Sequence, residues 1–166
     1  MKILLVSDTH GRTEELGRLL EAYRGEVGMV CHMGDYGRDL MRFEKANQSL
    51  KMVAVNGNSD FSPIGHTEQI VEVIAKNGKA LRLLVTHGHR FGVKRGFAKL
   101  LGYAKEMDLD AVFFGHTHEE VCFNEDGVFA VNPGSLAYGR RRERTYAIVT
   151  VTDDGGFEGE LLEYDF

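Results

Sequence analysis

The chain has 166 residues and a formal net charge of −5, from 20 basic and 25 acidic side chains, which argues against a protein that binds nucleic acid through a broad basic surface. A hydrophobic fraction of 43% and a charged fraction of 27% are typical of a globular protein, and the length fits a single domain over residues 1–166. The sequence shows no secretory leader and no apolar run long enough to cross a membrane, and its two cysteines lie far apart, so we expect a cytoplasmic protein with no membrane partner.

The first half of the chain alternates short apolar runs with segments of helical periodicity. Continuous apolar runs at residues 2–7, 29–32 and 51–55 predict strands that are buried on both faces. Helical spacing follows the first run, with Thr13 as the expected N-cap, and residues 39–47 also have a helical pattern. This alternation predicts a parallel α/β sheet.

The second half has a different pattern. Runs at 70–75 and 80–85, separated by Asn77-Gly78, predict a β-hairpin, and a helix over 97–107 leads to a strand over 111–114. Four further runs, bounded by turn residues, predict a mostly antiparallel meander at residues 121–124, 128–131, 146–152 and 157–163.

Polar clusters follow the strands that precede a loop or a helix. In an open α/β sheet such clusters meet at the carboxyl edge, where ligands bind. A shuffled chain of this composition would hold roughly 0.3 His-x-His pairs, whereas this sequence has two. The clusters are Asp8 with His10, Asp35, Asn58 with Asp60, His87 with His89, and His116 with His118.

These side chains have the chemistry of a metal site. Nitrogen and oxygen donors without cysteine suit Mn, Zn, Fe, Ni or Co. Seven donors exceed the needs of one tetrahedral ion and suit two ions that share a carboxylate. The candidate metal ligands are Asp8, His10, Asp35, Asn58, His87, His116 and His118.

The ordered motifs resemble those of the calcineurin-like metallophosphoesterase superfamily. They are Asp8-Thr9-His10, Gly34-Asp35, Gly57-Asn58-Ser59-Asp60, His87-Gly88-His89 and Gly115-His116-Thr117-His118. The His-Gly-His form and Asn132-Pro133-Gly134-Ser135 are similar to its small phosphodiesterase branch, the YfcE-like proteins. The resemblance implies a four-layer αββα sandwich of two mixed β-sheets flanked by helices.

The resemblance also implies roles for the ligands. One divalent ion would be bound by Asp8, His10, Asp35 and His118. The other would be bound by Asp35, Asn58, His87 and His116, which makes Asp35 the bridge. A hydroxide held between two ions, with Mn expected first, would attack phosphorus in line.

One position departs from the family. Many members have a histidine directly after the asparagine, where this chain has Ser59, and a serine hydroxyl is a poor proton donor at neutral pH. We expect His89 to take over the catalytic proton transfer. Asp60 is expected either to orient a metal ligand or to form an Asx-turn.

Substrate contacts are expected from cations and from a glycine-flanked serine near the same edge. Arg12, Arg90 and Ser135 are the candidates, and the dense basic cluster of Arg140, Arg141, Arg142 and Arg144 is either a solvated loop or a further phosphate attractor.

The sequence leaves two functions open. The first is a phosphodiesterase that hydrolyses a small phosphodiester. The alternative is a non-catalytic, metal-binding interaction scaffold of the VPS29 type. Retention of all seven candidate ligands favours the enzyme. Self-association into a homo-oligomer through exposed strand edges is also open.

Overall fold

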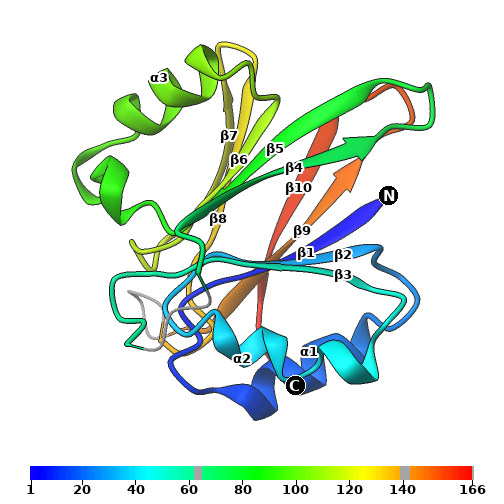
Figure 1. The fold of residues 1–166 in the computed structure, drawn as a ribbon, viewed down its shortest axis with the longest axis vertical. Coiled ribbons are helices and arrows are strands. Elements are labelled where there is room, and N and C mark those ends of the chain that lie inside the picture. Colours follow the sequence, from blue (N-terminus) through cyan, green and yellow to red (C-terminus); the bar gives the residue numbers. More distant parts are fainter. Residues whose placement is uncertain (62–64, 139–142, 166) are drawn as a thin grey trace.

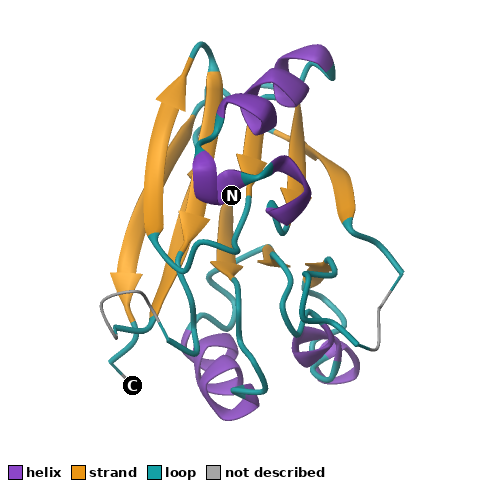
Figure 2. Ribbon diagram, turned by 90° about the vertical axis from the view of Figure 1, so that its left-hand side faces the viewer, coloured by secondary structure: helices purple, strands orange, loops and turns teal. Residues whose placement is uncertain are grey.

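Two five-stranded β-sheets stack face to face and carry helices on their outer faces (Figure 1). The structure is a computed structural model and describes residues 1–61, 65–138 and 143–165. The helices form two groups on opposite sides of the sheet pair (Figure 2). The layers are therefore helix, sheet, sheet and helix, which confirms the predicted αββα sandwich.

The first sheet has the strand order β10-β9-β1-β2-β3. Its strands are β1 (Lys2–Val6), β2 (Met29–His32), β3 (Lys51–Ala54), β9 (Thr145–Val151) and β10 (Phe157–Glu163). Strands β1, β2 and β3 are parallel, as predicted, whereas β9 is antiparallel to both β1 and β10. Its outer face packs against α1 (Thr13–Ala22) and α2 (Arg38–Met41), and the 3₁₀ turn η1 (Glu44–Ala46) follows α2.

The second sheet has the order β4-β5-β6-β8-β7. Its strands are β4 (Glu68–Ile74), β5 (Ala80–Thr86), β6 (Ala111–Phe113), β7 (Glu120–Glu125) and β8 (Val128–Pro133). The central strands β5, β6 and β8 are parallel, and the antiparallel strands β4 and β7 form the edges. Its outer face packs against α3 (Ala98–Glu106) and against the segment that contains the 3₁₀ turns η2 (His89–Phe91) and η3 (Val93–Arg95).

Alternation along the central strands explains their continuous apolar runs. In β1, Ile3 and Leu5 face the other sheet, whereas Leu4 and Val6 face the helices. All four side chains are 0% exposed. Each central strand thus contributes to the core between the sheets and to one core under the helices.

Two predictions about the helices of the first half need correction. Helix α1 begins at Thr13, so Arg12 is the N-cap residue, and it makes no side-chain capping bond. The predicted helix over 39–47 is only α2 followed by η1. The Phe43 ring packs against Gly17 of α1, and the Asn47 side chain donates to the Phe43 carbonyl, which ends the helical run.

The C-terminal strands do not form one meander. β7 pairs with β8 in the second sheet, whereas β9 pairs with β10 and β1 in the first. Between β8 and β9 the chain crosses from one sheet to the other, where Leu136 and Ala137 donate backbone hydrogen bonds to the carbonyls of Ser7 and Asp8. Among the described residues, none of the helices has the length and apolar character required to cross a membrane.

Candidate metal centre

Loops from both sheets converge at the carboxyl ends of the parallel strands. β1, β2 and β3 lead into the loops that carry four of the seven candidate ligands, and β5 and β6 lead into the loops that carry the other three. From the first sheet come Asp8, His10, Asp35 and Asn58; from the second come His87, His116 and His118.

The ligand loops hold their side chains with backbone conformations that non-glycine residues rarely adopt. Of the eight described non-glycine residues with positive φ, five are candidate ligands. Such conformations cost free energy and persist where the surrounding structure enforces them, which is typical of functional sites. These residues are Asp8 (51°), His10 (45°), Asp35 (49°), His116 (72°) and His118 (58°).

Two glycines permit the close approach of these loops. A Cβ atom at Gly57 would collide with the Asp35 carboxylate, and one at Gly115 would collide with the Ser7 hydroxyl and lie 2.9 Å from Asp8 Oδ2. Neither glycine has positive φ, so the requirement is for space rather than for conformation.

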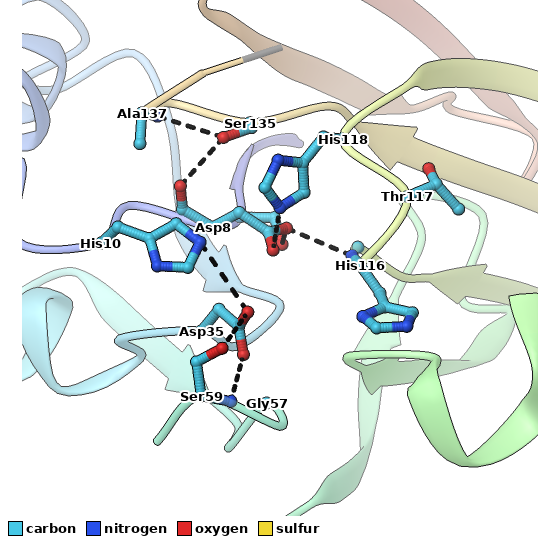
Figure 3. A network of polar contacts seen from close by, with 12 residues as sticks. Asp8, His10, Asp35, Gly57, Ser59, His116, Thr117, His118, Ser135 and Ala137 are labelled. Atoms are coloured by element: carbon cyan, nitrogen blue, oxygen red, sulfur yellow. Dashed lines mark hydrogen bonds and ion pairs between the residues drawn. The ribbon is translucent and has the colours of Figure 1, made fainter. Parts of the chain in front are cut away.

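Asp8 and His118 face each other across the centre (Figure 3). His118 Nε2 lies 3.0 Å from Asp8 Oδ1, and His118 Nδ1 lies 3.0 Å from the Tyr138 carbonyl. A carbonyl only accepts, so Nδ1 carries a proton. In a neutral ring, Nε2 would then direct a lone pair at a buried carboxylate oxygen that has no other hydrogen-bond partner. A proton or a cation must therefore lie between these two atoms.

The Asp35 carboxylate lies between histidines of different loops. Its Oδ2 is 3.8 Å from His10 Nε2, and its Oδ1 is 3.4 Å from His87 Nε2. His87 Nδ1 donates to the Met33 carbonyl at 2.7 Å, so in the neutral ring its Nε2 is also unprotonated. The two oxygens of Asp35 thus face two separate nitrogen donors.

Further donors surround His87 Nε2. Asn58 Oδ1 lies 3.1 Å from this nitrogen, and His116 Nδ1 lies 3.2 Å from it. In the neutral His87 ring, Nε2 has a lone pair and no proton. The side-chain oxygens of Asn58 and Asp35 that lie near this nitrogen therefore accept no hydrogen bond from it. Such a set of unprotonated donors fits a cation.

The charges of the cluster are coupled. Burial opposes ionisation of Asp8, but the hydrogen bond from His118 and the charges of His87 and His118 outweigh it and lower the Asp8 pKa. The same hydrogen bond raises the pKa of His118. Burial and the charge of His87 lower the pKa of His116 to about 4, so this imidazole is neutral at pH 7 and is able to act as a ligand.

The donor atoms fit divalent ions in both number and spacing. Donor atoms within 4.8 Å of one another come from two groups, namely Asp8 with His10 and His118, and Asp8 with Asp35 and His87. All are imidazole nitrogens or carboxylate oxygens, as Mn, Zn, Fe, Ni and Co accept. The residues present therefore fit the predicted kind of metal site.

Asp60 and Ser59 hold the loops that carry Asp35 and Asn58. Asp60 accepts the Tyr36 N–H at 2.9 Å and the Gly57 N–H at 2.6 Å, and so joins the loops after β2 and β3. Neither bond is that of an Asx-turn, in which the carboxylate accepts the N–H two residues onward, and the orientation of ligands by Asp60 stays a prediction. Ser59 donates to Asp35 twice, through its backbone N–H and its hydroxyl.

His89 lies beside the two neighbouring histidines of its sheet. Its ring centre is 5.3 Å from that of His87 and 6.1 Å from that of His116. Burial, with a contribution from His87, lowers its pKa. Its Nδ1 is buried and has no hydrogen-bond partner among the described residues.

The candidate substrate residues occupy different settings. Arg12 donates to the Tyr138 hydroxyl and lies over that ring, next to the carbonyl that binds His118. Arg90 is exposed and donates to Thr67. Ser135 is fully buried, and its hydroxyl donates to the Asp8 carbonyl, so this serine supports the loop after β1.

Of the basic cluster near the C-terminal strands, only one member can be placed. Arg140, Arg141 and Arg142 lie outside the described residues. Arg144 forms an ion pair with Glu15, whose carboxylate also pairs with Arg12. Glu15 thus bridges these two arginines.

A buried network beneath the centre was not predicted in full. His32 is fully buried, and both of its ring nitrogens are hydrogen-bonded. Its partner Thr9 donates to Asp39, which also accepts the Gly11 N–H beside His10. The role of Asp39 was missed because it lies on α2, away from any strand end. Only the tertiary fold brings it to the loop after β1.

Known proteins with similar sequences belong to the family that the motifs indicated. Residues 1–154 match the model for the calcineurin-like phosphoesterase superfamily domain. The probable metallophosphoesterase YsnB of Bacillus subtilis is 33% identical over 156 residues, which cover 93% of this chain and 86% of YsnB. The phosphodiesterase YfcE of Escherichia coli strain K12 is 30% identical over 156 residues, with coverages of 82% and 80%.

A solved structure of a protein that is not named a phosphoesterase has the same fold. Vacuolar Protein Sorting 29 from Cryptosporidium parvum has a TM-score of 0.75 and covers 99% of this chain and 98% of its own. At 15% identity this likeness concerns the fold alone. The family match over residues 1–154, together with the relatives named above, shows that the chain belongs to the calcineurin-like phosphoesterase superfamily.

Proposed function

We propose that this chain is a phosphodiesterase that hydrolyses a small phosphodiester at a centre of two divalent metal ions. The carrying observation is the convergence of imidazole nitrogens and side-chain oxygens from five loops. Two donor groups share Asp8, and the two oxygens of Asp35 face His10 and His87. A preference for diesters is supported by the named phosphodiesterase YfcE and by Ser59 at the position where many family members have a histidine.

Each ion would have its own set of ligands. Asp8, His10, Asp35 and His118 would hold one, and Asp35, Asn58, His87 and His116 would hold the other. Mn is expected first, with Zn, Fe, Ni or Co as the other candidates. Bound divalent ions supply positive charge against phosphoryl oxygens and make water acidic enough to lose a proton near neutral pH.

The remaining residues prepare this centre. The carbonyls of Met33 and Tyr138 hold Nδ1–H of His87 and His118, so that Nε2 of each ring points inward. Asp60 and Ser59 fix the loops around Asp35 without contact with the reacting atoms. Arg12 would attract the phosphate from the side of His118, and His89 would move the proton at the leaving oxygen.

The test is metal-dependent hydrolysis of bis(p-nitrophenyl) phosphate by wild type and by Asp35→Asn. We expect Mn²⁺ to stimulate the wild type, and Asp35→Asn to lower kcat about 100-fold or more because it removes a charged ligand. Asp153→Asn, which changes the same charge in an exposed ion pair with Lys76, should retain full activity. Absence of turnover in the wild type with each of the five candidate metals would contradict the proposal.

A metal-binding interaction scaffold is the second candidate. It is favoured by the fold that the chain shares with Vacuolar Protein Sorting 29 and by exposed Tyr36, Phe61 and Tyr138. The same assay separates the two functions, because a scaffold would bind the metal and hydrolyse nothing. Metal content by elemental analysis therefore accompanies the kinetic measurement.

A further inference from the structure

Two cavities adjoin the candidate metal centre on the side of the second sheet. Their volumes are about 560 Å³ and about 490 Å³. Lys94, Gly96 and His116 line both of them, so the cavities meet beside a candidate ligand. A substrate group attached to a phosphate at the metal centre would have this space to occupy.

The two cavities differ in the charged side chains that line them. Among the described residues, His89, Lys94, Arg95 and Lys99 line the smaller one, and no carboxylate does. The larger one combines Lys94 and Glu119 with the apolar side chains of Val93, Phe97 and Val121. Apolar walls beside a group of cations suit a partly apolar substrate that carries negative charge.

Lys94 is the cation common to both cavities. It is exposed, and within the described part of the chain it has no ion-pair partner. It lines both cavities together with His116, so its charge lies beside a candidate ligand of the metal centre. An unpaired ammonium in the wall of these cavities would attract a second anionic group of the substrate.

The backbone that carries Lys94 is held firmly. It follows His87 through Gly88 and turns twice, in η2 and η3, with Gly92 (φ 68°) between the turns. Val93 is 2% exposed and packs against Gly88, where an added Cβ would lie 3.0 Å from its Cγ2. The position of Lys94 is therefore tied to the loop that carries His87, and the cavity is preorganised.

We propose that these cavities bind the part of the substrate beyond the scissile phosphate, and that Lys94 selects phosphodiesters in which that part carries a second negative charge. The inference rests on the proposed phosphodiesterase function. The phosphodiester group that is hydrolysed has a single negative charge, which the metal centre would neutralise. The cations of the cavity would then bind a second negative charge elsewhere on the substrate. A nucleoside with a terminal phosphate has the required combination of apolar surface and additional charge.

The experiment compares the dinucleotide adenylyl-adenosine with its 5′-phosphorylated form, using the full-length Mn²⁺-loaded protein. The two compounds share one scissile diester and differ only in the terminal phosphate. We expect a KM about tenfold lower for the phosphorylated form, and we expect added salt to reduce this preference because it screens Lys94. Lys94→Gln should remove most of the preference, and Lys94→Glu should reverse it.

A control variant with the same change of charge is Lys2→Glu. Lys2 begins β1, at the opposite end of that strand from Asp8, so this variant should keep the wild-type preference. Equal KM values for the two dinucleotides in the wild type would overturn the inference, as would equal effects of Lys94→Glu on both. If the wild type still hydrolyses bis(p-nitrophenyl) phosphate, the proposed function survives that result; if it hydrolyses no diester, both fail.

Discussion

At the scale of single residues, the histidines differ by what their second ring nitrogen binds. His87 and His118 donate Nδ1–H to backbone carbonyls, which leaves Nε2 for a metal ion. His32 has both nitrogens bonded and is fully buried, so burial lowers its pKa to about 4 and it remains a neutral structural residue. His89 has a buried Nδ1 without a hydrogen bond. The hydrogen-bond partners of the ring nitrogens thus distinguish the candidate metal ligands from the structural histidine and from the candidate for proton transfer.

The proton-transfer role of His89 can be measured with two leaving groups. Nitrophenolate leaves without a proton, whereas the alkoxide of adenylyl-adenosine needs one. We therefore expect His89→Ala to lower kcat about 100-fold for the dinucleotide and far less for bis(p-nitrophenyl) phosphate.

The control for this prediction is His66→Ala, which removes an exposed histidine that is not a candidate ligand. It should change neither rate. Equal losses on both substrates in His89→Ala would assign His89 to positioning instead, and unchanged rates would remove it from the mechanism.

At the scale of elements, the loops after the strands matter more than the strands themselves. Asp60 joins the loop after β2 to the loop after β3 through two backbone N–H groups. Gly57 allows these loops to touch, because its missing side chain leaves room for the Asp35 carboxylate. The spacing of candidate ligands therefore depends on the contact between two loops that are far apart in the sequence.

Gly57→Ala tests this dependence. The added methyl group must displace Asp35, so we expect Mn²⁺ affinity to fall about tenfold or more, as measured by calorimetric titration. Gly102→Ala is the matched control, since Gly102 lies in α3 with no atom within 4 Å of the added Cβ. The control should bind Mn²⁺ normally and gain about 0.5–1 kcal/mol in stability because alanine favours the helix. Unchanged affinity in Gly57→Ala would contradict the steric argument.

At the scale of the whole molecule, the candidate centre joins the two sheets. Asp8 and Asp35 follow strands of the first sheet, and His87 and His116 follow strands of the second. Metal binding would tie the two together at one end of the sandwich. Because the unfolded chain lacks this geometry, the bound metal should stabilise the folded state.

Metal removal should therefore lower the melting temperature. At a free Mn²⁺ concentration about 100 times Kd, we expect a stabilisation of about 2.7 kcal/mol, which treatment with EDTA reverses. Differential scanning calorimetry of the wild type and of Asp35→Asn provides the measurement. The variant should show a much smaller shift, and an equal shift in both proteins would place the stabilising metal elsewhere.

Much of the fold could be predicted because local patterns and tertiary structure agree. The continuous apolar run of β1 and the Asn77-Gly78 turn each specify a local structure that the sandwich retains. The helix expected over 39–47 was shortened by packing of Phe43 against α1, and the C-terminal meander was divided by the crossing between sheets. Both differences result from contacts between segments that are distant in the sequence, and the periodicity of a single segment does not predict such contacts.

The sequence alone determined the family, the layered fold and the candidate ligand set, because ordered polar motifs after apolar strands survive as a linear pattern. The tertiary structure decided which nitrogen of His87 faces the centre, that Ser135 supports Asp8, and that Lys94 lines both cavities beside His116. These properties depend on the distance and orientation of groups on different loops. They arise only when the two sheets have packed.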